Sequence, residues 1–139
     1  MGTSQQMRET PLVVVVDDDA SVRQSTCRLV RSFGYRAQAF ASAEDFLDSG
    51  KTAETGCLIL DVCMPGMDGL ELQHRLLDSA PATPIVFITA RASDEQEQRA
   101  LRAGAVAFLR KPVGKDALFR VLGQVLAESA SGGGNEDDD

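Results

Sequence analysis

Residues 58–69 read LILDVCMPGMDG and give the clearest view of how the chain is organised. An apolar run of strand length leads directly into a single carboxylate, Asp61, and a Pro65-Gly66 turn and a helix start at Asp68 follow. A buried strand that ends in this way presents one polar side chain at the edge of a sheet. The alternative is that Asp61 only begins a turn, as aspartate often does.

The composition is that of one globular domain with an aliphatic core. The chain has 139 residues, of which 43% are hydrophobic, 25% are charged and only 5% are aromatic. A chain of this length can bury a core of its own. The net charge is −7, and residues 136–139 supply four of the negative charges. A modestly acidic body argues against direct, sequence-independent binding of nucleic acid.

The cysteines and the lack of long apolar runs indicate the compartment. Cys27, Cys57 and Cys63 form no CxxC pair, which argues against a disulfide framework or a zinc site and fits a reducing cytosol. No apolar run approaches the roughly 20 residues of a membrane span. Residues 1–10 lack the apolar segment of a signal peptide. We therefore expect a cytoplasmic protein that does not enter a membrane.

Strand and helix patterns alternate along the chain. Asp68 with Glu71, and Ser93 with Gln96, have the spacing of capping boxes, while Ser21 and Asp19 compete as the N-cap of the first helix. The expected strands are 12–16, 36–40, 57–60, 85–88 and 105–109, with a loop at 50–56. The expected helices are marked by Val22 to Phe33, by a short helix that opens at Ser42 and carries Phe46 and Leu47, by Leu70 to Leu77 after the cap Asp68, by the stretch from the cap Ser93 to about Arg102, and by Ala117 to Leu126.

This alternation predicts a three-layer α/β/α fold, a doubly wound sandwich around a five-stranded parallel sheet. Parallel strands need helical crossovers, and right-handed crossovers cover both faces of the sheet. Four of the expected strands are followed by Asp17 and Asp18, by Asp61, by Thr89 and by Lys111. Ligands in such sheets bind at the carboxyl ends of the strands. We therefore expect these five side chains to converge on one site.

Two or three acids, a hydroxyl and an amine at one site suit phosphoryl chemistry. Converging carboxylates repel one another unless a cation lies between them, and Mg²⁺ is the hard cation that binds through a few carboxylates. A lysine can pair with a phosphoryl oxygen as a point charge. One carboxylate in such surroundings can attack phosphorus and form an acyl phosphate.

The ordered set of motifs strongly resembles the receiver domains of bacterial two-component response regulators. The motifs are Val16-Asp17-Asp18, Asp61 with Met64-Pro65-Gly66-Met67-Asp68-Gly69, Ile88-Thr89-Ala90 and Lys111-Pro112. The likeness covers residues 11–128, so residues 1–10 are expected to be a disordered leader and 129–139 a flexible Gly-rich acidic tail. Ala103-Gly104-Ala105 and Phe108 look similar to receivers attached to helix-turn-helix transcription factors. The resemblance implies the flavodoxin-like strand order 2-1-3-4-5.

The resemblance also implies the roles of the acidic residues. Asp61 would accept a phosphoryl group from a phosphohistidine on a sensor histidine kinase or a phosphotransfer protein. Asp18 would bind Mg²⁺ directly, Asp17 would bind it through water, and the backbone carbonyl of Cys63 would be a further ligand.

A second set of implied roles concerns the response to the phosphate. Thr89 and Lys111 would contact the phosphoryl oxygens, and Pro112 would follow a cis bond. Thr89 and Phe108 would form a switch that changes the surface of helix 94–102, strand 105–109 and the last helix. Homodimerisation on that surface would follow phosphorylation.

Three departures and three rival functions accompany the resemblance. Phe108 lacks the hydroxyl of the usual tyrosine, and Cys63 and Arg91 occupy positions that tune phosphate lifetime in the family. One rival is a receiver-like interaction module that works without phosphorylation. The others are a turnover enzyme, although an aspartyl phosphatase would have a second Asp in place of Cys63, and a flavin carrier. Asp19 is expected to be a helix cap and His74 a surface residue.

Overall fold

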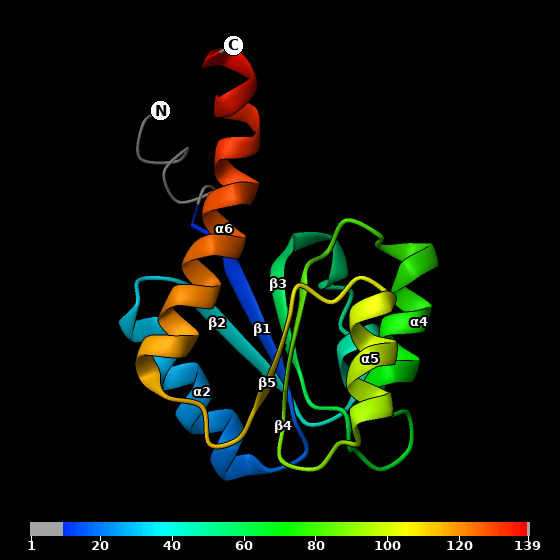
Figure 1. Ribbon diagram of the computed structural model, residues 1–139. Coiled ribbons are helices and arrows are strands. Elements are labelled where there is room, and N and C mark those ends of the chain that lie inside the picture. Colours follow the sequence, from blue (N-terminus) through cyan, green and yellow to red (C-terminus); the bar gives the residue numbers. More distant parts are fainter. Residues whose placement is uncertain (1–9, 139) are drawn as a thin grey trace.

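The computed structural model describes residues 10–138 and contains one five-stranded parallel sheet (Figure 1). Its strands lie in the order β2-β1-β3-β4-β5, so the expected flavodoxin-like fold and strand order are confirmed. The strands are β1 (Leu12–Val16), β2 (Arg36–Phe40), β3 (Thr55–Leu60), β4 (Ile85–Thr89) and β5 (Ala107–Arg110).

Helices cover both faces of this sheet (Figure 1). Two of them, α2 and α6, pack on one face, and three, α3, α4 and α5, pack on the other. Their bounds are α2 (Ala20–Ser32), α3 (Ala43–Asp48), α4 (Gly69–Ser79), α5 (Asp94–Arg102) and α6 (Lys115–Asp138), with a 3₁₀ turn, η1 (Thr52–Glu54), before β3. Among the described residues no helix is long and apolar enough to cross a membrane.

Alternation along β1 divides the core into two layers. Val13 and Val15 pack with residues of α2 and α6, whereas Val14 and Val16 pack with residues of α3, α4 and α5. All five residues of β1 are buried, as expected of a strand covered on both sides. The continuous apolar run at 12–16 therefore reflects its central position in the sheet.

The helix starts agree with the sequence at two sites and resolve a competition at a third. Asp68 and Ser93 each form a complete capping box. Asp19, and not Ser21, caps α2, because its extended backbone lets the carboxylate accept from the amides of Ser21 and Val22.

Three element boundaries differ from the expectation by two residues or more. β3 begins at Thr55, inside the expected loop 50–56, because backbone pairing with Leu12 continues beyond the apolar run. β5 begins at Ala107, because Ala105 still donates to the carbonyl of Ala100 at the end of α5. α6 continues to Asp138, whereas a flexible tail is expected from residue 129. Helical backbone pairing is local and can continue there despite the glycines; flexibility of this segment stays a prediction.

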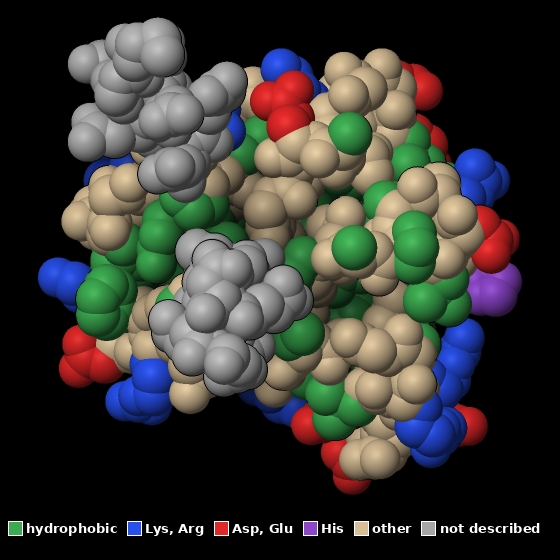
Figure 2. Space-filling model, turned by 90° about the horizontal axis from the view of Figure 1, so that it is seen from above, with side chains coloured by type: hydrophobic (Ala, Val, Ile, Leu, Met, Phe, Trp, Pro, Cys, Tyr) green, Lys and Arg blue, Asp and Glu red, His purple; other side chains and the backbone are tan. Residues whose placement is uncertain are grey.

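The end of the sheet where the strands begin, opposite their carboxyl ends, carries side chains of both charges. Figure 2 looks at this end, and acidic and basic side chains alternate around its rim. His74 is exposed on α4, as expected of a surface residue.

Candidate functional site

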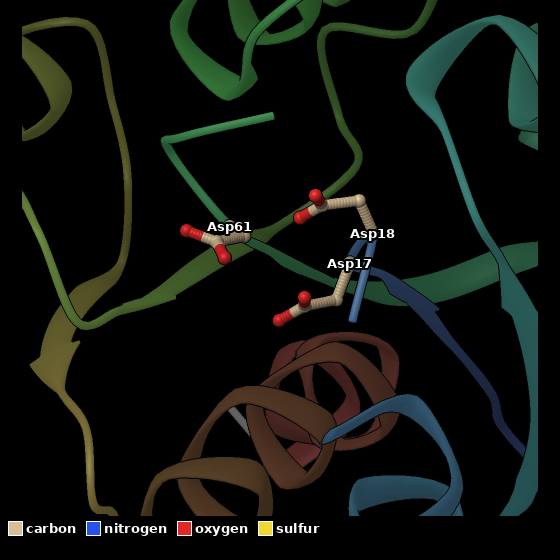
Figure 3. Close-up of side chains that lie close together, drawn as sticks. All are labelled: Asp17, Asp18 and Asp61. Atoms are coloured by element: carbon tan, nitrogen blue, oxygen red, sulfur yellow. The ribbon is translucent and has the colours of Figure 1, made fainter. Parts of the chain in front are cut away.

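The carboxyl ends of β1 and β3 bring three aspartates together (Figure 3). One carboxylate oxygen from each of Asp17, Asp18 and Asp61 lies within 4.8 Å of the others. Asp17 and Asp61 are 4% and 7% exposed, whereas Asp18 is exposed. The adjacent pairing of β1 with β3 produces this convergence, because it places residues 17 and 61 directly beyond paired strand ends.

Lys111 bridges the two buried carboxylates. Its Nζ donates to Asp17 Oδ2 at 2.9 Å and to Asp61 Oδ2 at 3.1 Å. The residue follows β5, and its backbone amide donates to the carbonyl of Thr89. The Lys111–Pro112 peptide bond is cis, as the resemblance implied. The structure thus brings together one amine and three carboxylates, of which Asp17 and Lys111 are 94 residues apart in the sequence.

The charges within this cluster influence one another. Burial raises the pKa of Asp17, and the charge of Asp61 adds to the rise, against the opposing hydrogen bonds from Asp19 and Lys111. Burial alone would lower the pKa of Lys111, but its hydrogen bonds to Asp17 and Asp61 and their charges outweigh burial and raise it. Lys111 is therefore a firmly charged ammonium that offsets the repulsion between two buried acids.

The donor atoms fit a hard divalent cation. The carboxylate of Asp18, the residue after Asp17, and the backbone carbonyl of Cys63, two residues after Asp61, make no hydrogen bond with any described residue. Oxygen ligands of this kind, with room for several waters, are what Mg²⁺ prefers. The cluster of Asp17, Asp18 and Asp61 could therefore hold a metal ion, which would offset the repulsion among the three carboxylates.

Thr89 and Phe108 lie on the neighbouring strands β4 and β5, where Thr89 pairs with Arg110 and Phe108 pairs with Phe87. Thr89 is fully buried, and its hydroxyl is 3.5 Å from the carbonyl of Arg91. The half-buried ring of Phe108 lies 5.7 Å from that of Phe87, centroid to centroid. The guanidinium of Arg110 lies 5.4 Å from the centre of the Phe108 ring. Thr89 is joined to the site through its carbonyl, which accepts from the amide of Lys111, and Phe108 is partly buried three residues before Lys111; their role as a switch stays a prediction.

Cys63 and Arg91 meet at the mouth of the site. The thiol of Cys63 donates to the carbonyl of Arg91 at 2.6 Å, and the amide of Cys63 donates to Asp61 Oδ1 at 3.1 Å. Both side chains are exposed. The sequence predicts that each lies at the mouth but gives no sign of the contact between them.

Sequence reasoning missed two residues that shape the site. A side chain at Gly69 would collide with the backbone oxygen of Asp61, so only glycine allows α4 to begin this close to the acid. Glu44 accepts a hydrogen bond from the amide of Met67, in the loop that follows Asp61. The first could have been suspected from a glycine at a helix start, but no local pattern links residues 44 and 67.

Comparisons with known proteins agree with this geometry. The family model described as response regulator receiver domain matches residues 13–122. Response regulator protein TmoT of Ectopseudomonas mendocina is 35% identical over 126 residues, which cover 91% of this chain and 57% of that protein. Transcriptional regulatory protein FixJ of Azorhizobium caulinodans is 35% identical over 131 residues, covering 94% and 62%. The chain therefore spans less than two thirds of the length of these relatives.

A solved structure gives the same result in three dimensions. The response regulator StyR matches with a TM-score of 0.79 and 42% identity, over 93% of this chain and 67% of that chain. The likeness thus extends over nearly the whole described region.

Proposed function

Because this chain belongs to the family of response regulator receiver domains, we propose that it is a signalling switch activated by phosphorylation of Asp61. A sensor histidine kinase or a phosphotransfer protein would supply the phosphoryl group. The observation that carries the proposal is the ammonium of Lys111 shared between Asp17 and Asp61, beside the free carboxylate of Asp18.

The transfer requires little covalent chemistry from the protein. An oxygen of Asp61 forms a bond to phosphorus as the bond from phosphorus to the imidazole nitrogen of the phosphohistidine breaks, and the imidazole keeps the electron pair. The product is an acyl phosphate on Asp61. Such transfers depend mainly on positioning and on neutralising the equatorial oxygens.

The neighbouring residues supply these two requirements. Asp18, Asp17 and the backbone carbonyl of Cys63 would hold Mg²⁺, with Asp17 acting through water. Lys111 would exchange its contact with Asp61 for a phosphoryl oxygen, and the hydroxyl of Thr89 would turn from Arg91 toward another. Cys63 and Arg91, which stand at the mouth, would set how readily water reaches the acyl phosphate and so its lifetime.

The proposed output is a changed surface on α5, β5 and α6. Thr89 pairs with Arg110 of β5, so a movement of Thr89 would displace this strand, which also carries Phe108. The domain would work as a switch that phosphorylates and dephosphorylates itself with Mg²⁺, not as a turnover enzyme. The name of FixJ supports a further proposal, that the switch controls transcription.

Intact mass spectrometry tests the proposal. Incubation with Mg²⁺ and a small phosphodonor such as acetyl phosphate should add one phosphoryl group that is labile to base. Asp61→Asn keeps the size of the side chain but cannot attack phosphorus, so it should fold and stay unmodified. No adduct on the wild type would favour an interaction module that works without phosphorylation, and an adduct on Asp61→Asn would identify another acceptor.

A further inference from the structure

The loop between Asp61 and α4, residues 62–68, is fixed at its base. The amide of Gly69 donates to the carbonyl of Val62 at 2.9 Å. Because a side chain at Gly69 would collide with the backbone oxygen of Asp61, the first turn of α4 lies directly against the acceptor. We call residues 62–68 the acceptor loop.

The tip of the acceptor loop is fixed from a different element. Glu44 lies in the first turn of α3, and its Oε2 accepts from the amide of Met67 at 3.0 Å. Gly66 has a φ of +74°, and a side chain there would come within 2.9 Å of the same carboxylate oxygen. The amide of Met67 lowers the pKa of Glu44, which keeps the carboxylate ionised and a strong acceptor.

We call the hydrogen bond from the amide of Met67 to Glu44 the tether. A short series of contacts links this tether to the carboxylate of Asp61. The acceptor loop includes Cys63, whose amide donates to Asp61 Oδ1 at 3.1 Å. This hydrogen bond orients the Asp61 carboxylate and leaves Oδ2 toward Lys111. The path of the loop between its base and its tip therefore determines where the Cys63 amide and carbonyl lie.

We infer that Glu44 is a positioning residue for Asp61, holding the acceptor loop so that Cys63 orients the reactive carboxylate. The inference deepens the proposed function and rests on it, because it assigns the residue that sets the geometry of the proposed acceptor. Partners that orient a site through one intermediate commonly change affinity or activity by tenfold or more when removed. Small displacements of reacting groups have large effects on rate for the same reason.

Three variants separate the tether from other effects. Glu44→Ala removes the acceptor of the Met67 hydrogen bond, whereas Glu44→Gln keeps an oxygen in its place and removes only the charge. Asp45→Ala is the matched control, because Asp45 is the next acid in the same turn of α3, is exposed, and has a carboxylate that makes no hydrogen bond or ion pair with a described residue. All three should melt within a few degrees of the wild type, since Glu44 is exposed.

The measurements are amide hydrogen exchange at Met67 and Cys63, Mg²⁺ affinity from NMR titration, and the initial rate of phosphorylation by acetyl phosphate at saturating Mg²⁺. Glu44→Ala should speed exchange at both amides, weaken Mg²⁺ binding and slow phosphorylation, each by about tenfold. Glu44→Gln should recover most of the loss, and Asp45→Ala should match the wild type.

Several outcomes would overturn the inference. One is faster exchange at Met67 in Glu44→Ala with unchanged Mg²⁺ affinity and phosphorylation rate, since the tether would then be structural only. Another is an equal loss in the Gln and Ala variants, which would point to charge. If the wild type takes no phosphate, the proposed function fails, but Mg²⁺ affinity and exchange at Cys63 still decide whether Glu44 positions the site.

Discussion

At the scale of single residues, repulsion among the carboxylates of the site is partly offset by the ammonium of Lys111. Asp17 and Asp61 are buried together, and Lys111 contacts both of them. Asp18 is the exposed member of the group, and its carboxylate makes no ion pair with any residue that the structure describes. Like charges held this close oppose folding, whereas the unfolded chain separates them. The acids are therefore placed for chemistry at some cost in stability.

Asp18→Asn tests this balance. In chelator, the variant should melt slightly higher than the wild type, because one of three converging charges is gone and solvent screens part of the gain. Mg²⁺ binds only the folded site and should stabilise the wild type by about 1.4–2.7 kcal/mol at roughly ten to a hundred times its Kd. Thermal melts with chelator and with Mg²⁺ measure both effects. A variant that melts lower in chelator, or a wild type indifferent to Mg²⁺, would contradict the expectation.

The raised pKa of Asp17 gives a pH dependence with a definite sign. Its folded value lies above the ordinary 3.8, so the folded state takes up the proton first as the pH falls. The destabilisation caused by Asp17 is therefore present above the folded pKa and is relieved as the pH drops through it toward 3.8.

This sign can be measured as a difference between two proteins. The unfolding free energy of Asp17→Asn minus that of the wild type, in chelator, should become less positive or more negative from pH 7 toward pH 4. Asp48→Asn, at an exposed position on α3, serves as the control and should show no such trend. A difference that moves in the opposite direction would mean that Lys111 outweighs burial at Asp17.

At the scale of elements, β5 connects the site with the α5 surface. Arg110 pairs with Thr89 in the sheet and precedes Lys111, which contacts the acids. Its guanidinium donates to the carbonyl of Ala92 at 2.7 Å and to Glu97 at 2.8 Å. The side chain of Arg110 thus links the start of α5 to β5.

Arg110→Ala should loosen α5 without unfolding the domain. Exposed ion pairs stabilise a fold by about 0–1 kcal/mol, so the loss in unfolding free energy should stay within that range. Amide exchange in the first turn of α5, at Asp94 to Glu97, should nevertheless rise, because the contacts to Ala92 and Glu97 are lost. Arg102→Ala, in the last turn of the same helix, is the control. Unchanged exchange in the first turn would show that Arg110 does not restrain the helix.

At the scale of the whole molecule, the α5 and β5 surface is where association is expected. Leu101 and Val106 are large apolar side chains that are 38% and 50% exposed, and they lie at the end of α5 and just before β5. Apolar side chains exposed close together often mark an interaction surface. They lie next to β5, which pairs with the strand of Thr89 and which we propose to change with the phosphate, so they are the side chains on which we base the expected association.

Sedimentation velocity measures this association directly. With Mg²⁺ and beryllofluoride as a phosphate mimic, the wild type should shift from monomer toward dimer, whereas Asp61→Asn should not shift. Val106→Lys should weaken the dimer, because it places a charge in the apolar contact. Identical monomer profiles with and without the mimic would contradict dimerisation.

Much of the fold and of the candidate site could be predicted from the sequence. The apolar run at 12–16 and the alternation of strand and helix patterns indicated a doubly wound sheet, and the confirmed strand order came from the family resemblance. The capping boxes at Asp68 and Ser93 could be predicted because the partner of each cap lies only three residues further along the chain. The convergence of Asp17, Asp18 and Asp61 followed from parallel strands ending at one edge.

Only the tertiary structure decided which groups touch. The bridge from Lys111 to two acids, the contact of Cys63 with Arg91 and the tether from Glu44 to Met67 join residues 23 to 94 positions apart. The start of β3 at Thr55 depends likewise on pairing with Leu12. Periodicity and caps record interactions within a few residues, so they determine elements and their order. Contacts between elements depend on how the crossovers pack on the sheet, and that packing is settled by the whole core at once.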